Sequence, residues 1–171
     1  MIDSSGAPLD PVGTFTGPGP WEFALADVAS TRALGESIGR YLATPGLVVA
    51  LVGELGAGKT TLVQGLARGL GVPDTTRVTS PTYTLLMEHA GRLTLFHADG
   101  YRLKNPWEWL DLGGDEVLAS GGVTCIEWPD KVGPFLPPHR LQVALSHTEN
   151  GRLARVEWIG LVLPRPSFTD Q

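Results

Sequence analysis

The order of apolar and polar positions predicts strands that alternate with helices along most of the chain. Residues 47–52 read Leu-Val-Val-Ala-Leu-Val, and such a continuous apolar run is typical of a parallel strand that is buried on both faces. Shorter apolar or alternating runs predict further strands at 21–25, 92–97 and 123–126. The strand at 47–52 is therefore expected in the middle of a sheet.

Helical spacing appears between the predicted strands. A helix is expected at 31–42, where apolar residues recur at helical spacing and where Asp27 or Ser30 could cap the first turn. A second helix is expected at 60–70, closed by the glycine that follows it. The pattern also predicts a helix at 106–119.

A hairpin is predicted near the C-terminus. Residues 141–145 and 153–158 alternate between apolar and polar side chains, and they flank the turn-forming pair Asn150 and Gly151. Strands that alternate with helices favour an α/β fold. We expect a three-layer α/β/α domain of the P-loop NTPase type, with a mostly parallel central sheet and this antiparallel hairpin at one edge.

Length and composition suggest a single folded domain. The chain has 171 residues, which leaves little room for a second domain. Residues 1–20 contain many Gly and Pro and few large apolar side chains, so they are expected to form a disordered leader. Residues 164–171 resemble them and are expected to form a flexible tail. The folded part is placed at 21–163, and we find no internal repeat in it.

Charge and cysteine content exclude several classes of protein. The net charge is −5, and the thirteen Lys and Arg residues form no basic stripe, so tight unaided binding to RNA is not expected. Cys125 is the single cysteine, which excludes an internal disulfide and fits a reducing cytosol. There is neither a signal-peptide pattern nor a run of about 18 apolar residues. We expect a cytoplasmic protein that does not enter a membrane.

The segment after the strand at 47–52 is a complete P-loop, Gly-Glu-Leu-Gly-Ala-Gly-Lys-Thr. Its glycines let the backbone N–H groups point toward phosphates, and the following helix adds its positive dipole end. Lys59 is expected at the β- and γ-phosphates, and Thr60 at magnesium. A glycine-rich turn with an incidental Lys-Thr would not require this strand–loop–helix context. The predicted nucleotide-binding residues are Gly53, Glu54, Leu55, Gly56, Ala57, Gly58, Lys59, Thr60 and Thr61.

Two carboxylates follow predicted strands. Asp99 and Glu127 each come directly after an apolar run, and the carboxyl ends of parallel strands meet at one edge of a sheet. A P-loop enzyme needs an acidic residue for magnesium and a group that orients the nucleophile. A lone carboxylate at a strand end would more often be a solvated side chain. The P-loop in the same sheet favours a site.

The loop before the strand at 92–97 carries a candidate switch. Ser80 and Thr82 flank a proline, and a hydroxyl there could contact the γ-phosphate or magnesium. An ordinary proline turn explains these residues equally well. His97 is interpreted as a packed or hydrogen-bonded strand residue rather than a general base.

Three classes of P-loop protein could contain these residues. A GTP-dependent switch would need an Asn-Lys-x-Asp motif for the base, which the chain lacks. A small-molecule kinase would need an acceptor pocket and usually an arginine-rich lid, whereas the arginines of residues 60–125 do not cluster. An ATPase that acts on a protein partner fits this short chain best. A small-molecule kinase remains the alternative.

Five motifs occur in order across most of residues 31–132. They are Thr31 with Leu34 and Gly35, then residues 53–61, 78–84, 97–102 and 126–129. Each motif beyond the P-loop is weak by itself, but the five in this order are specific together. Through them the sequence resembles the bacterial TsaE (YjeE) family. One departure is Gly100, where the family usually has a leucine.

The resemblance implies a function in forming N6-threonylcarbamoyladenosine (t6A) in tRNA. It implies slow magnesium-dependent ATP hydrolysis by a protein that acts on the TsaB–TsaD pair and meets tRNA only through these partners. Magnesium would bind at Thr60 and Glu127. Asp99 would orient water or act in catalysis, together with Lys59 and Glu127, and the loop with Ser80 and Thr82 would be the family's switch.

Overall fold

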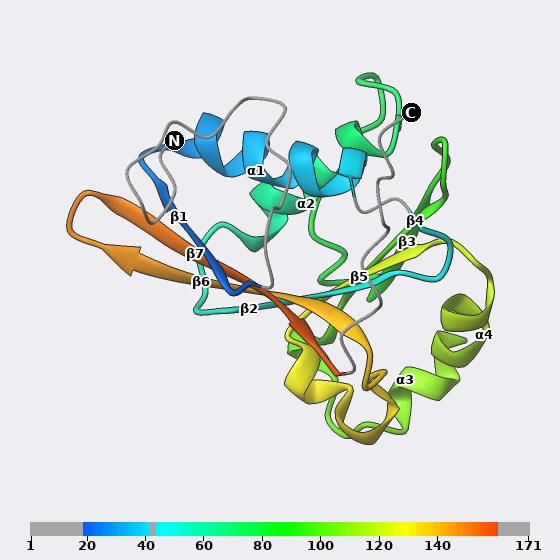
Figure 1. Ribbon diagram of the computed structural model, residues 1–171. Coiled ribbons are helices and arrows are strands. Elements are labelled where there is room, and N and C mark those ends of the chain that lie inside the picture. The colour runs from blue at the N-terminus through cyan, green and yellow to red at the C-terminus, as the bar shows by residue number, and fades with distance from the viewer. Residues whose placement is uncertain (1–18, 42–43, 161–171) are drawn as a thin grey trace.

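A computed structural model describes residues 19–41 and 44–160 (Figure 1). The predicted tail and all but the last two residues of the predicted leader lie outside these ranges, as does the predicted end of the first helix at Leu42. Within the described residues, the strands form one seven-stranded sheet in the order β1-β7-β6-β2-β5-β4-β3. The strands are β1 (Trp21–Leu25), β2 (Val48–Gly53), β3 (Leu86–His89), β4 (Leu95–Asp99), β5 (Val123–Glu127), β6 (Arg140–Thr148) and β7 (Gly151–Ile159).

The centre of the sheet is parallel and its two sides are antiparallel. Strands β6, β2, β5 and β4 run parallel to one another. The predicted hairpin is confirmed as β6 and β7, but β1 pairs outside β7, so the hairpin itself does not form the edge. At the other side, β3 pairs antiparallel with β4. Strand β3 was not predicted, because four residues that include Glu88 and His89 give too short an apolar signal.

Helices cover both faces of the sheet, which confirms the predicted three-layer α/β/α fold (Figure 1). Helices α1 (Val28–Tyr41) and α2 (Lys59–Gly69) lie on one face, and α3 (Glu108–Asp111) and α4 (Gly114–Ala119) lie on the other. Buried side chains form two cores, one for each face. Along β5, Cys125 belongs to the core under α1 and α2, whereas Ile126 belongs to the core under α3 and α4.

Helix α1 begins earlier than predicted, at Val28. The backbone N–H of Ser30 donates to Asp27 Oδ1 at 2.7 Å, and the Asp27 N–H donates to Ser30 Oγ at 3.0 Å. Both residues that were considered as caps therefore cap the helix reciprocally, as in a capping box.

The prediction of one continuous helix at 106–119 was wrong. Gly113 adopts a left-handed conformation (φ 75°) between α3 and α4, so the chain turns there. Gly114 lies directly against the Trp109 side chain, because a Cβ on Gly114 would be only 2.0 Å from the indole ring. The two short helices pack around the buried indole instead of forming one rod.

Helices α1 and α2 cross in backbone contact through glycines. The backbone of the partner helix is contacted by Gly35 and Gly39 on α1 and by Gly65 and Gly69 on α2, each pair spaced by four residues. A Cβ on Gly65 would lie 2.0 Å from the carbonyl oxygen of Arg32, which is far inside van der Waals contact. This small-residue crossing holds α2 close against α1. Because α2 begins directly after the P-loop, the crossing also supports the loop.

No helix within the described ranges is long and apolar enough to span a membrane.

Candidate functional site

The P-loop connects β2 to α2, as the sequence predicted. Gly53, Gly56 and Gly58 all have positive φ angles, of 153°, 79° and 106°. A side chain at Gly53 could not be accommodated, because its Cβ would lie 2.5 Å from the carbonyl oxygen of Leu145 on β6. Glycines here thus meet both a conformational and a steric requirement. The other predicted loop residues differ in exposure, since Leu55 is 76% exposed and Ala57 is fully buried.

Lys59 is the first residue of α2, and its ammonium group is held by the P-loop itself. Lys59 Nζ donates to the carbonyl oxygens of Gly53 and Glu54, each at 2.8 Å. The same nitrogen lies 4.2 Å from the centre of the Trp128 ring, in a cation–π contact. Burial lowers the pKa of Lys59, and two nearby carboxylates partly oppose this effect. The lysine therefore already lies in the loop where phosphates are expected.

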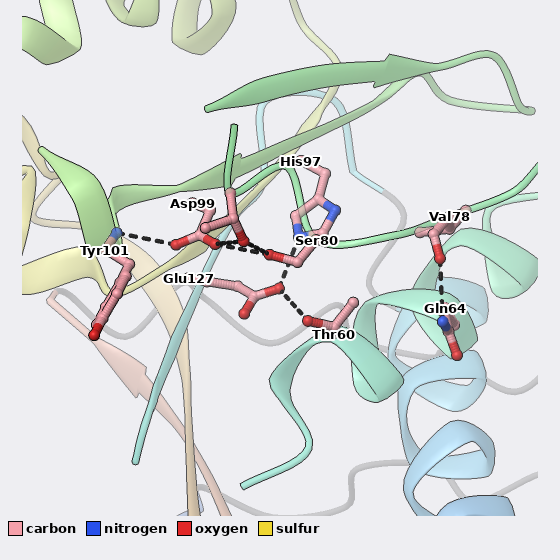
Figure 2. Close-up of polar contacts among 9 residues, drawn as sticks. Thr60, Gln64, Val78, Ser80, His97, Asp99, Tyr101 and Glu127 are labelled. Carbon is pink, nitrogen blue, oxygen red and sulfur yellow. Dashed lines mark hydrogen bonds and ion pairs between the residues drawn. The ribbon is translucent and has the colours of Figure 1, made fainter. Parts of the chain in front are cut away.

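Glu127 ends β5 and links the P-loop helix to the sheet. Its Oε1 accepts a hydrogen bond from the Thr60 hydroxyl at 2.9 Å and pairs with His97 Nε2 at 2.9 Å (Figure 2). Glu127 is 3% exposed and His97 is fully buried. The structure thus brings together Thr60 and Glu127, the two residues that were predicted for magnesium.

Asp99 ends β4, directly beside Glu127 in the register of the parallel pair. Its Oδ2 accepts from the Ser80 hydroxyl at 2.7 Å, and its Oδ1 accepts from the backbone N–H of Tyr101 at 2.9 Å (Figure 2). The same Oδ2 also accepts from the Thr82 hydroxyl at 3.0 Å. The two predicted switch residues therefore contact the predicted catalytic carboxylate, which an ordinary proline turn does not require.

Two residues at the site had no predicted role. Trp128 covers Lys59 and itself has a left-handed backbone (φ 56°). Its signals in the sequence were its place directly after a strand-end carboxylate and within the motif at 126–129. Arg152 on β7 donates to the carbonyl oxygen of Gly56 at 3.4 Å across 96 residues of sequence. Nothing in the sequence indicates this contact, since it depends on how the hairpin folds beside the loop.

The donors at the site fit magnesium that arrives with a nucleotide. Among the described residues, no group of three or more His, Cys, Asp or Glu side chains could hold a metal alone. Magnesium in such sites is usually held by one or two carboxylates, water and substrate phosphates. The Thr60 hydroxyl donates its hydrogen to Glu127, so its oxygen lone pairs remain available to a cation.

Comparison with known proteins places the chain in a family. The family model described as "Threonylcarbamoyl adenosine biosynthesis protein TsaE" matches residues 25–155. The chain belongs to the TsaE family. The predicted resemblance is thereby confirmed, and the matched range includes the P-loop, both carboxylates and the candidate switch.

Individual TsaE relatives agree with this assignment. The chain is 43% identical over 121 residues to the tRNA threonylcarbamoyladenosine biosynthesis protein TsaE of Treponema pallidum, which covers 71% of this chain and 87% of the relative. It is 42% identical over 117 residues to TsaE of Bacillus subtilis, and the match covers 68% of this chain and 71% of that relative. The crystal structure of YdiB from Bacillus subtilis superposes with a TM-score of 0.69 at 33% identity, covering 81% of this chain and 85% of YdiB.

Proposed function

We propose that this TsaE-family protein binds and slowly hydrolyses ATP with magnesium in the cytoplasm, and that it supports t6A formation by acting on the TsaB–TsaD pair. One observation carries the enzymatic part of this proposal. The carboxylates of Asp99 and Glu127 lie in register at the ends of adjacent parallel strands, and Glu127 is hydrogen-bonded to the P-loop helix through Thr60. Phosphoryl transfer on a P-loop needs an acidic residue for magnesium and a group that orients the nucleophile, and these two carboxylates would supply one each.

Nucleotide binding would use groups that are already in place. The backbone of Gly53–Thr60 would donate to the phosphates, and Lys59 would exchange two carbonyl oxygens for phosphate oxygens. Thr60 and Glu127 would hold magnesium, which neutralises charge on the β- and γ-phosphates when it is bound. Asp99 would orient the attacking water.

Hydrolysis would be coupled to the loop that carries Ser80 and Thr82. Both hydroxyls donate to Asp99 in this structure. A γ-phosphate beside Asp99 would compete for these hydroxyls, and its release would let them return. Tyr83, next to Thr82, is 86% exposed, and the guanidinium carbon of Arg102 lies 4.5 Å from the centre of its ring. Movement of the loop would therefore change the surface that a partner meets.

The partners would supply the contact with tRNA. The net charge of −5 without a basic stripe is a poor match for a phosphate backbone. ATP hydrolysis would therefore influence the modification through contact with a partner protein and not through contact with tRNA. The relatives named above are tRNA threonylcarbamoyladenosine biosynthesis proteins, which supports the pathway for this chain.

Reconstitution with purified TsaB and TsaD tests this proposal. Modified tRNA is measured over several rounds without this protein, with it, and with its Lys59→Ala form. We expect accumulation beyond one equivalent per complex only with the wild-type protein. Equal accumulation in all three mixtures would refute the coupling. Micromolar binding of tRNA by the protein alone at physiological salt would refute the indirect contact.

A further inference from the structure

The buried imidazole of His97 is attached to the site through a single hydrogen bond. His97 lies on β4, fully buried, opposite Cys125 on β5. Its Nε2 is 2.9 Å from Glu127 Oε1. Its Nδ1 is buried and has no hydrogen-bond partner among the described residues. The one hydrogen-bond partner of the imidazole among the described residues is therefore the Glu127 carboxylate.

The chemistry of the pair fixes where the hydrogen lies. An ionised carboxylate can only accept hydrogen bonds, so the nitrogen that faces Glu127 carries the hydrogen. Thr60 donates to the same oxygen, Oε1. No described residue donates to the second oxygen, Oε2. The two donors therefore hold the carboxylate in one orientation with one oxygen occupied and the other left for a metal ion or its water.

We propose that His97 is a positioning residue for the magnesium site, acting through Glu127 and not on the nucleotide. The proposal rests on the function proposed above, since it assumes that Glu127 serves magnesium. By holding Glu127 Oε1 toward the Thr60 hydroxyl, His97 keeps the hydrogen of that hydroxyl on the carboxylate side. The Thr60 oxygen then presents its lone pairs to the cation. Groups in this indirect position typically change metal affinity about 10- to 100-fold.

Three variants separate positioning from mere packing. His97→Leu removes the donor and keeps an apolar volume. His97→Gln places an amide N–H about where Nε2 lies. His89→Leu is the matched control, because His89 is also buried, lies on the adjacent strand β3 and makes no contact with Glu127.

The measurement is the calorimetric affinity for ADP with and without magnesium. In the wild type and in His89→Leu, magnesium should strengthen ADP binding by the same factor. In His97→Leu this factor should fall about tenfold or more while the affinity without magnesium stays the same, and His97→Gln should restore most of it. A wild-type magnesium factor in His97→Leu would overturn the proposal, as would an equal loss in His89→Leu.

Two further outcomes are also decisive. If His97→Leu does not fold, His97→Gln is compared with His97→Asn, whose shorter amide reaches the place of Nδ1 and not of Nε2. Equal magnesium factors in these two would overturn the proposal. If the wild type binds no magnesium nucleotide, the proposed function fails and this role of His97 fails with it. A normal wild type with an unaffected His97→Leu refutes only the role of His97.

Discussion

Gly65→Ala tests how closely the fold depends on the crossing of α1 and α2. Helix propensity alone predicts stabilisation, because alanine is more favourable than glycine inside a helix by about 1 kcal/mol. The structure predicts the opposite. The new Cβ would lie 2.0 Å from the carbonyl oxygen of Arg32 and 2.8 Å from its carbon. Both atoms belong to the backbone, so no side chain can rotate to make room.

The magnitude follows from the size of this overlap. Ordinary contact needs more than 3 Å, so the helices must separate by about an ångström, and such overpacking typically costs about 1–3 kcal/mol or more. The upper end of this range applies because both clashing atoms are backbone, so a cost of about 3 kcal/mol less the gain of about 1 kcal/mol in propensity leaves a net loss of about 2 kcal/mol in the free energy of unfolding. For a domain of this size that corresponds to a fall in Tm of about 4–8 °C.

Urea denaturation and thermal melts of Gly65→Ala measure the loss. Arg68→Ala is the control, because Arg68 lies on the exposed side of the same helix and its ion pair with Asp74 is long, at 3.6 Å. The control should stay within about 0.5 kcal/mol of the wild type. If Gly65→Ala melts at the wild-type temperature or above, the backbone contact does not limit the crossing and the reasoning is refuted.

Three other predictions concern the site and its surroundings. Lys59→Ala should stay folded and lose nucleotide binding, because no other described ammonium group lies in the P-loop; unchanged ATP affinity in a calorimetric titration would contradict the phosphate assignment. Asp99→Ala and Glu127→Ala should retain nucleotide binding and lose hydrolysis by about tenfold or more, as measured by phosphate release; wild-type rates in both would make the carboxylates structural. Burial, aided by the nearby His97, lowers the pKa of His89 from its ordinary value of 6.5. The unfolded chain therefore binds more protons below that pH, so the free energy of unfolding should fall on acidification by up to about 1.4 kcal/mol per pH unit. Denaturation curves from pH 7.5 to 5 should show a shallower fall for His89→Leu, and parallel curves would exclude this contribution.

The centre of the fold could be predicted because its signals are local. The apolar run of β2, the P-loop glycines and the carboxylates that end β4 and β5 are all read from adjacent residues. Once β4 and β5 are neighbours in the sheet, parallel pairing places Asp99 beside Glu127. The candidate site was predictable to the same extent, since its main residues lie at strand ends or in the loop.

The remainder depends on contacts between distant segments. The glycines of α1 and α2 have no apolar side chains, so a hydrophobic pattern cannot reveal that the helices touch there. The bond between His97 and Glu127 requires the lateral spacing of two strands. The break at Gly113 is local, but it accompanies the packing of Gly114 against the Trp109 indole, which a pattern of apolar positions does not show. Such features are determined by packing, which competes with local propensity and here prevails over it.

The position of Lys59 also has a kinetic consequence. Because two loop carbonyls and the Trp128 ring hold its ammonium group, the loop has internal contacts of its own that favour its curled shape. Nucleotide capture then requires the movement of one side chain and no rearrangement of the loop backbone. The observed rate of initial binding should rise linearly with nucleotide concentration, without the plateau that a slow opening of the loop would impose. Any slower phase belongs to the segment around Thr82, whose hydroxyl must first leave Asp99.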